Sequence, residues 1–510
     1  MRAEAALAAL AVILPAFSTG QPGAERQGLG LVQVAEAALR ANPDLLVSRQ
    51  RLAAARGVLR SAGGPFDPVL SIELAGSDAD QPLGTAQQSQ LGLRINDTHS
   101  FGYSLGATSS LRTGASLEAE LSASRVADSL TYLTPEHQAT LDLTLRQPLL
   151  EGRGRQVATA EENAARQQVL AEEALVSAQA RSTTLAAVSR YWEYVGAVRS
   201  SLATERAADD ADRLLENTRA LAAADAIPRQ EVRQAEAKVA TRAAELAAAR
   251  QKVVAARHAL GLAMGARAGE IHSLPLPADD FPAIPQEALP ELDRLVGAAL
   301  ARRDDLRAAR QELQAARLLE HRAANRMLPR LDLLLGAGYA SLLDAPGRSA
   351  FLEVYSANRG SHVQTSLRLE LPVNRSAEIG SLEQARSAER EAALGVESLE
   401  RAVASAVDVA ASAVEATRDR ATSTRAAREA YEAAVDNEGQ KYSAGLATLI
   451  DVLITGDQLV AARLAEIQAQ VDLATAIARL RFETACLPDS EDTVTLAALT
   501  SFPRAGELEE

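Results

Sequence analysis

Short stretches of alternating apolar and polar residues interrupt long helical patterns at two places in the chain. Residues 331–339 and 363–371 alternate with a two-residue period, and residues 139–147 do so in the first half. A segment of about ten residues with this period is typical of a strand in an outer-membrane barrel. The pattern therefore predicts strands within 65–148 and within 330–372.

Helical patterns follow each of these strand regions. Apolar residues recur every three or four positions around 158–222 and 378–442, and no proline lies between Pro148 and Pro228. A helix of about 70 residues is about 105 Å long at 1.5 Å per residue, which no ordinary globular domain needs. Returning helices at 229–262 and 449–487 would close two long antiparallel helical hairpins.

The chain repeats itself at a period of more than about 200 residues, which indicates a duplicated domain, since solenoid repeats are about 20 to 50 residues long. "AALRANPDLLVSRQRLAAARG" near the start is echoed by "AALARRDDLRAARQELQAARL" in the second half. "LTLRQPLLEGRGR" around Pro148 corresponds to "LRLELPVNRSAEI" around Pro372, and "AAADAIPRQEV" corresponds to "YSAGLATLIDV". We therefore predict a mainly α protein built from a duplicated unit of helix, strands and long helical hairpin.

The predicted domain organisation has five parts. The apolar run after Met1-Arg2 resembles a secretory signal peptide, and prolines concentrate between the repeats. The first strand region is longer than the second, so an additional hairpin or an extended wall is expected there. The parts are a signal peptide (1–24), a first repeat (25–264; strands within 65–148, hairpin 153–264), a linker (265–290), a second repeat (291–487; strands 330–372, hairpin 375–487) and an acidic tail, expected to be partly disordered (488–510).

Composition excludes several function classes. The single cysteine, Cys486, excludes a disulfide framework and a cysteine-based metal site. The six histidines are scattered without ligand spacing, and the chain has no phosphate loop, dinucleotide fingerprint or nucleophile motif. A net charge of -14 argues against a nucleic-acid binder. We predict no enzyme activity, no metal and no cofactor.

Membrane insertion, if it occurs, must use the strands. Apart from the start of the chain, no run approaches the 18 to 20 apolar residues, roughly, of a spanning helix. Four strands, the number expected from two hairpins, cannot close a barrel, because transmembrane barrels have about eight or more. Open strand edges in lipid leave backbone groups unpaired, so several copies would have to complete one sheet.

Residues 31–487 resemble the TolC-like outer membrane efflux proteins. The marks are "RQPLLEGRGR" after a strand, "RRDDLRAARQELQAA" before the second strand pair and "YSAGLATLIDVL" at the second hairpin turn. The resemblance implies a homotrimer in the outer membrane of a Gram-negative-type cell, with a twelve-stranded β-barrel continued by an α-helical barrel in the periplasm. It also implies a passive conduit for tripartite efflux or type I secretion, working with a periplasmic adaptor (membrane fusion) protein and an inner-membrane pump of RND or ABC type.

Carried onto this sequence, the family pattern indicates two kinds of site residue. The turns that would contact the adaptor are Ala224, Asp225, Ala226 and Ile227 in the first repeat, and Ala444, Gly445, Leu446, Ala447 and Thr448 in the second. Asp225 stands where a glycine is usual. The periplasmic gate would involve Tyr442, Asp451 and Asp457. Tyr442 could instead serve packing, and Asp451 could instead stabilise a helix start.

Two other readings remain open at this point. The Ala/Glu/Arg-rich rods alone would suit a structural coiled-coil protein without a pore, but such a protein gives no reason for strands at matching places. A periplasmic adaptor also has a helical hairpin, but it would have one hairpin between β modules and not two copies. The cargo cannot be read from these residues.

Overall fold

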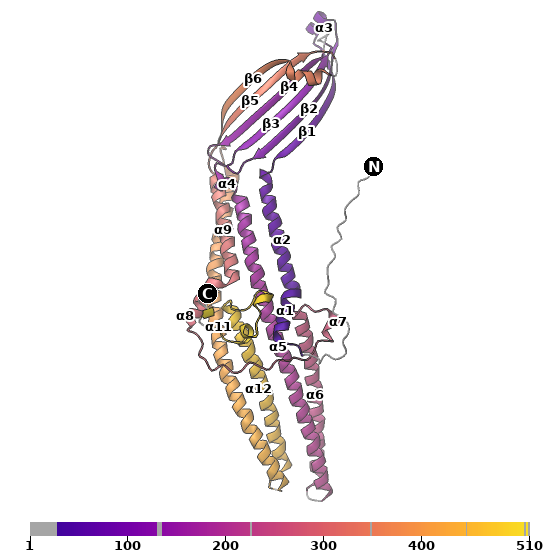
Figure 1. Ribbon diagram of the computed structural model, residues 1–510, viewed down its shortest axis with the longest axis vertical. Helices are drawn as coiled ribbons and strands as arrows, with labels where there is room; N and C mark the ends of the chain where they lie inside the picture. The colour runs from indigo at the N-terminus through magenta and orange to yellow at the C-terminus, as the bar shows by residue number, and fades with distance from the viewer. Residues whose placement is uncertain are drawn as a thin grey trace. The chain divides into compact units, whose positions relative to one another are not determined.

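The strand regions fold into one antiparallel sheet. The computed structural model describes residues 28–129, 135–224, 227–346, 349–444, 446–503 and 506–507. Within them the sheet has six strands in the order β1-β2-β3-β4-β5-β6, each paired with its neighbours in sequence (Figure 1). The strands are β1 (Val69–Pro82), β2 (Ile95–Ser110), β3 (Ser116–Asp128), β4 (Glu136–Pro148), β5 (Arg330–Asp344) and β6 (Asn358–Glu370).

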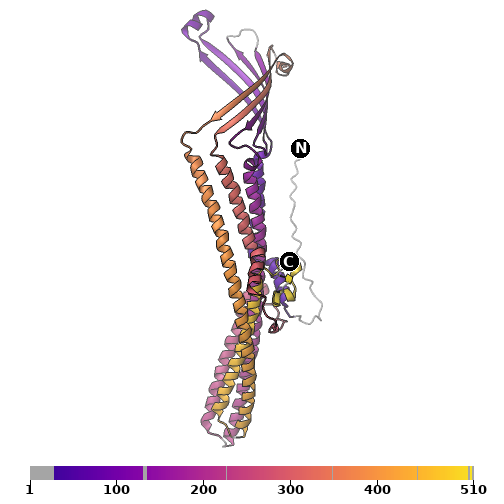
Figure 2. The same cartoon turned by 90° about the vertical axis from the view of Figure 1, so that its left-hand side faces the viewer.

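The expectation of four strands per chain is therefore corrected. The longer first strand region supplies a complete additional hairpin, β1–β2, capped by the short helix α3 (Thr85–Leu91). Thirteen or more residue pairs join β1 to β2 and β2 to β3, from Val69 with Thr108 to Ser110 with Ser116. This hairpin is thus a full part of the sheet wall. Figure 2 shows the strong twist of the sheet, which antiparallel sheets share.

The sheet has one apolar and one polar face. Following the pairing, Ile72, Leu105, Leu121, Leu141 and Tyr339 lie on one face. The opposite face carries serine, threonine, glycine and charged residues. Because successive side chains on a strand point to opposite faces, the two faces keep this difference over most of the sheet, except in the polar run 77–81 of β1.

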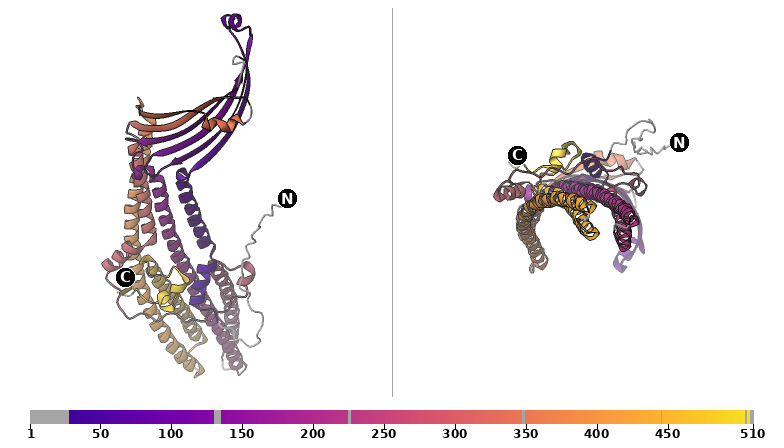
Figure 3. Two further views of the ribbon diagram at one scale, coloured as in Figure 1. Left: turned by 45° about the horizontal axis from the view of Figure 1, so that its top comes forward. Right: turned by 90° about the horizontal axis from the view of Figure 1, so that it is seen from below.

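The connection between β5 and β6 folds back over the apolar face. It contains α10 (Ala350–Glu353) and η2 (Val354–Ser356); Figure 3, left, draws α10 across the strands. The Phe351 ring contacts the rings of Phe101, Tyr103 and His137, and the Tyr103 and Tyr355 hydroxyls are 2.8 Å apart. The loop therefore covers the part of the apolar face around Ala123 and Ala139, whereas Ile72, Leu105 and Leu141 on the same face remain exposed.

Short helices precede each strand region and complete the ends of the chain. Asn42 caps α2, accepting from the amides of Asp44 and Leu45, and Pro43 occupies the first turn where its missing N–H costs nothing. The remaining short elements are α1 (Leu31–Ala41), α2 (Pro43–Gly63), η1 (Gly64–Phe66), α4 (Arg155–Ala158), α7 (Ala268–Ile271), α8 (Leu292–Arg302), α9 (Asp304–Asn325), η3 (Glu491–Thr493) and α13 (Leu496–Thr500).

Two long helical hairpins account for most of the chain. The first consists of α5 (Ala160–Ala223) and α6 (Arg229–Ala263), and the second of α11 (Ser376–Ser443) and α12 (Leu449–Glu483). α11 has 68 residues and is about 100 Å long. None of the helices in the described part of the chain combines the length and the apolar composition needed to cross a membrane.

The chain divides into two compact units. Unit 1 contains the hairpin ends and comprises Met1–Ala38, Ala186–Ile284 and Asp419–Thr475. Unit 2 contains the sheet and comprises Leu39–Leu185, Pro285–Arg418 and Ala476–Glu510.

In unit 1 the segment after α7 is fastened to α5. The Asp279 carboxylate accepts from the Leu31 amide at 2.6 Å and from the Tyr191 hydroxyl at 2.7 Å. The Trp192 ring packs against Phe281. Burial, together with the bond to Asp279, raises the pKa of Tyr191 well above its ordinary value, so the hydroxyl remains a donor.

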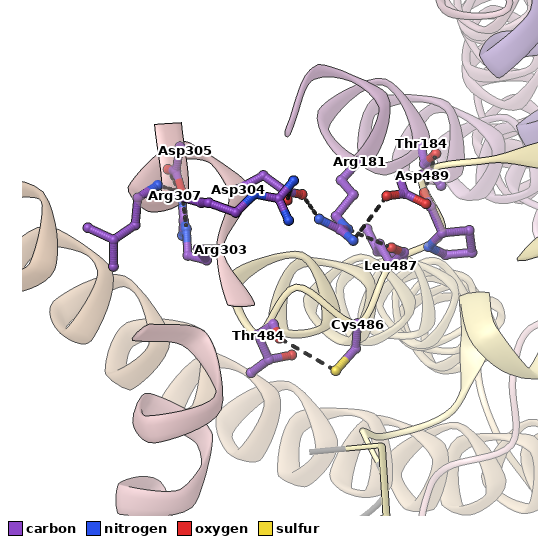
Figure 4. A network of polar contacts seen from close by, with 12 residues as sticks. Arg181, Thr184, Arg303, Asp304, Asp305, Arg307, Thr484, Cys486, Leu487 and Asp489 are labelled. Carbon is purple, nitrogen blue, oxygen red and sulfur yellow. Dashed lines mark hydrogen bonds and ion pairs between the residues drawn. The ribbon is translucent and has the colours of Figure 1, made fainter. Parts of the chain in front are cut away.

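In unit 2 the "RRDD" residues form a clamp, shown in Figure 4. Arg181 on α5 is ion-paired with Asp304, and it also donates to the Leu487 carbonyl and to Asp489, both at 3.1 Å. Arg303 pairs with Asp305 at 2.7 Å and with the buried Glu483 at the end of α12. Burial lowers the pKa of Arg181, but a guanidinium stays charged. The clamp joins α5, α9 and the C-terminal end of α12.

Residues 488–503 of the tail pack within unit 2, and the expectation of partial disorder for the whole tail stays a prediction. Val494, Leu499 and Phe502 are buried. Arg481, 2% exposed at its side chain, donates to the Ser501 carbonyl at 3.2 Å and pairs with Glu507 at 3.2 Å. The apolar residues among the acidic ones give the tail enough burial to fold onto unit 2.

Candidate functional site

The turn of the first hairpin lies between α5 and α6. Ala224 continues the last turn of α5, donating to the Ala220 carbonyl at 3.2 Å, and Pro228 begins α6. Beside the turn, Arg219 and Glu236 form an ion pair of 2.8 Å across the two helices. Asp225 and Ala226 lie outside the described residues, and Ile227 directly precedes Pro228.

The turn of the second hairpin is closed by backbone bonds. The Ala444 amide donates to the Gln440 carbonyl at 3.1 Å, and the Leu446 amide donates to the Lys441 carbonyl at 2.8 Å. Gly445 lies outside the described residues. Leu446 is 80% exposed, and Ile450 and Ile454 are also exposed. Ile450 and Ile454 lie four residues apart on α12 and therefore share one face of that helix, and Leu446 lies in the turn just before it.

Asp451 and Thr448 cap the start of α12. The Asp451 carboxylate accepts from the Thr448 amide at 3.0 Å and from the Thr448 hydroxyl at 2.7 Å, and the Asp451 amide faces the Thr448 hydroxyl at 3.4 Å. These bonds hold the pKa of Asp451 below its ordinary value. Asp451 therefore carries an exposed negative charge in a fixed position, and it also stabilises the helix start.

Tyr442 lies in the last turn of α11, one turn before the hairpin turn. Its hydroxyl is buried and has no hydrogen-bond partner among the described residues. A buried hydroxyl without a partner costs free energy, about 1–3 kcal/mol. The position is thus suited to a partner group other than those that the described residues supply.

Asp457 links the two hairpins. On α12, its carboxylate accepts from Arg242 on α6 at 2.5 Å and is also paired with Lys238. Arg242 is 6% exposed and is held from its other side by Glu245 at 2.6 Å. Two cavities, of 760 and 540 Å³, lie along these helices, and Lys238, Arg242 and Asp457 line both of them. Asp457 is therefore not an isolated acidic side chain.

The second half of the chain matches a known protein family. Residues 295–484 match the family model described as outer membrane efflux protein. They form an outer membrane efflux protein domain. The resemblance predicted from the sequence motifs is confirmed for these residues. No curated protein sequence matches the chain significantly.

Solved outer membrane channels share the fold over most of the chain. The CmeC outer membrane channel of Campylobacter jejuni superposes with a TM-score of 0.66 at 16% identity, covering 89% of this chain and 85% of its own. VceC from Vibrio cholerae gives 0.63 at 19% identity, with 89% and 95% covered. The open-state MtrE channel of Neisseria gonorrhoeae gives 0.63 at 18% identity, with 91% of both chains covered. The predicted fold class, a β-barrel portion continued by long helices, is confirmed.

In unit 1, ion pairs tie the two helices of the efflux protein domain's hairpin together. Sequence reasoning missed them, although the helical spacing of arginines and acidic residues on both α11 and α12 was a usable signal. The pairs are Arg420 with Asp472 (2.9 Å), Arg428 with Glu466 (2.7 Å) and Arg463 with Glu432 (3.0 Å). Each pair joins α11 to α12. The link from α12 to α6 is made by Asp457, which pairs with Lys238 and Arg242.

Within the described residues, no group of three or more His, Cys, Asp or Glu side chains is placed to hold a metal ion. The efflux protein domain and the first hairpin meet in unit 1 through Asp457, Arg242 and Lys238.

Proposed function

We propose that the chain is one protomer of a homotrimeric outer membrane channel that serves as a passive export conduit in tripartite efflux or type I secretion. The observation that carries the proposal is the two-faced sheet with unpaired outer edges, attached to two hairpins of the efflux protein fold. An apolar face suits the hydrocarbon core of a membrane and a polar face suits a water-filled interior. The helical hairpins would form the periplasmic tunnel.

The sheet also separates this proposal from the alternatives. A structural coiled-coil protein has no use for strands whose apolar side chains remain exposed. Leu70 and Ile72 on β1 and Val363 on β6 are 75–82% exposed. Side chains of this kind need a lipid or protein neighbour. The fold of solved outer membrane channels, shared over most of the chain, supports the same conclusion.

The gate would lie at the hairpin ends. The ion pairs of Asp457 with Arg242 and Lys238 would hold the second hairpin against the first and so keep the entrance narrow. Asp451 would add an exposed ring of negative charge in the trimer, which favours cations at the entrance and is screened by salt. In the closed trimer, a neighbouring copy would supply the hydrogen-bond partner of the Tyr442 hydroxyl, and this hydrogen bond would break when the gate opens.

The adaptor would dock on the hairpin turns. Ile450 and Ile454 on one face of α12 and Leu446 in the turn before it are exposed on the single chain, and exposed apolar side chains beside charged residues suit a helical partner. The turn residues Ala224, Asp225, Ala226, Ile227, Ala444, Gly445, Ala447 and Thr448 belong to the same proposed surface. An inner-membrane pump of RND or ABC type would supply the energy, so the channel itself needs no catalytic residue.

Reconstitution tests the proposal. The purified protein, added to a planar lipid bilayer without nucleotide or other energy source, should give discrete cation-preferring conductance steps. Fractionation should place the protein in the outer membrane. Failure to conduct, combined with recovery as a detergent-free soluble monomer, would contradict the proposal.

A further inference from the structure

Among the described residues, no strand pairs with the outer edge of β1 or with that of β6. β1 is paired with β2 and β6 is paired with β5, and both stand at the ends of the strand order. Almost every residue of β1 and β6 is exposed. In lipid, an open edge leaves backbone N–H and C=O groups without partners. A second copy of the same chain is the partner that offers the complementary edge.

We infer that β1 of one copy pairs antiparallel with β6 of the next, so that three copies of this six-stranded sheet close an eighteen-stranded barrel. The inference rests on the proposed trimer and replaces the twelve strands that four per chain would give. Since six is an even number, β1 and β6 run in opposite directions within the sheet. The ring therefore closes with the same antiparallel pairing that the sheet uses throughout.

The register of this junction follows from the sheet itself. Crossing the sheet from Val69 along paired residues leads through Thr108, Glu118, Thr144 and Gly336 to Gln364. β6 continues from Gln364 to Glu370, six residues further. Val69 and Glu370 are the ends of β1 and β6 that connect to the helices. If these ends lie level in the ring, Val69 of one copy pairs with Glu370 of the next.

This stagger agrees with the geometry of closed barrels. The offset of six residues between Gln364 and Glu370 accumulates over six strands, which is one residue per strand. An eight-stranded barrel with the same ratio of stagger to strand number has its strands tilted by about 36°, and transmembrane barrels have tilts of about 35–45°. Barrels of 16 to 18 strands leave an aqueous channel. The exit of this conduit would thus be wide.

The side chains provide an independent check. When Val69 of one copy is paired with Glu370 of the next, Leu70 lies opposite Leu369 and Ile72 lies opposite Leu367. Apolar residues therefore meet apolar residues across the junction. On the polar face, Ser71 meets Arg368. A slip of one residue would bring every apolar side chain of one strand to the polar face of the other.

The charged residues of β1 and β6 are also compatible with the pairing of Val69 with Glu370. Asp80 falls opposite Arg359, and Glu73 falls opposite Ser366. No like charges are directly opposed between 69–81 and 358–370 in this alignment. Like charges directly opposite each other would destabilise the pairing.

Disulfide cross-linking tests the junction. In a Cys486→Ser background, which removes the native thiol, Ser71→Cys is combined with Arg368→Cys, and Glu73→Cys with Ser366→Cys as a second pair. Directly opposed residues have Cα atoms about 4.5–5.5 Å apart, which is within reach of a disulfide. Mild oxidation of the membrane-embedded protein should give covalent dimers and trimers that reductant removes.

Two controls use the same β1 cysteine. The pair Ser71→Cys with Leu367→Cys places the two thiols on opposite faces of the sheet. The pair Ser71→Cys with His362→Cys tests the unstaggered junction, in which Val69 would pair with Gln364. Both should cross-link at least about tenfold less than Ser71→Cys with Arg368→Cys. Strong cross-linking in either control, or none in the two designed pairs, would overturn the inferred register.

Amine cross-linking of the same preparations separates this inference from the proposed function. A trimer captured by amine cross-linking, without disulfides between β1 and β6, would overturn the eighteen-stranded closure and leave the proposed trimeric channel standing. Absence of any oligomer by both methods would overturn both.

Discussion

Asp457 on α12 accepts a hydrogen bond from Arg242 on α6 at 2.5 Å, and this contact joins the hairpin of the efflux protein domain to the first hairpin. Arg242 is buried and paired with Glu245, so Glu245 holds the guanidinium in position for its contact with Asp457. Lys238 adds a second positive charge on the same side. The pair is the structural basis of the proposed gate.

Removing this link should open the channel. Arg242→Gln leaves Asp457 with Lys238 alone, and a hydrogen bond to a charged group contributes roughly 1.5 kcal/mol. That free energy shifts an open–closed equilibrium about tenfold, so the open fraction in planar bilayers should rise by about that factor. Arg250→Gln is the matched control, because Arg250 on α6 pairs with Glu205 on α5, inside the first hairpin. Equal effects of both variants would contradict the gate role of Arg242.

Asp451 should control the entry of cations. Asp451→Ala should raise single-channel conductance and reduce block by multivalent cations, because three fixed negative charges leave the entrance. The experiment is a planar-bilayer recording at low and high salt, since screening should shrink the difference. Conductance and block equal to those of the unaltered protein would remove Asp451 from the gate.

The cap at the start of α12 should depend on pH. The pKa of Asp451 is lowered in the folded protein by its bonds from Thr448, so the stabilisation is present above the ordinary value of 3.8 and is lost as the pH falls through the lower, folded pKa. The protection of the amides at 448–451 against hydrogen exchange, measured relative to their intrinsic rates at each pH, should therefore fall in that acid range. Asp451→Asn should remove the pH dependence, whereas Thr448→Ser should keep it. An unchanged pH dependence in Asp451→Asn would contradict the assignment.

The clamp of the "RRDD" residues should stabilise unit 2. Asp304 is almost fully buried between Arg181 and Arg307, and breaking a buried ion pair from one side costs about 3–5 kcal/mol. Asp304→Ala should lower the thermal unfolding midpoint followed by circular dichroism. Glu491→Gln removes an exposed pair with Arg40 and should cost less than about 1 kcal/mol. A larger effect for Glu491→Gln than for Asp304→Ala would contradict this account.

A strained residue lies two positions after the end of α12. Ala485 has φ 57°, in the left-handed region, and the Cys486 amide donates back to the Arg481 carbonyl at 2.7 Å. Ala485→Gly should stabilise the protein by about 1 kcal/mol, because glycine adopts this conformation without the Cβ penalty. Ala465→Gly, in the interior of α12, should destabilise it by about the same amount. Thermal unfolding of the two variants should therefore shift in opposite directions.

The sequence predicted the long hairpins well, because absence of proline and helical periodicity are local properties. Helix α6 was expected at 229–262 and is observed at Arg229–Ala263. The β1–β2 hairpin was foreseen only as an unplaced extra element, since β1 contains the polar run Ser77-Asp78-Ala79-Asp80-Gln81, where the alternation fails. The place of this hairpin in the sheet depends on pairing between strands, which is not a local property of the sequence.

The site was predictable in part. The position of Asp451 near a helix start follows from the turn "SAGLATL", and the structure adds its bonds with Thr448. The partners of Asp457 could not be read from the sequence, because Lys238 and Arg242 are more than 200 residues away and meet it only after two hairpins pack. The packing of residues 488–503 was not foreseen, because their few apolar residues are spread among acidic ones.

An electron cryomicroscopy reconstruction of the protein in lipid nanodiscs tests the central claim most directly. The account predicts three copies whose sheets close around a continuous water-filled passage in the bilayer, with the long hairpins extending from one side. A single copy, or a sheet lying outside the bilayer with no passage, would contradict it.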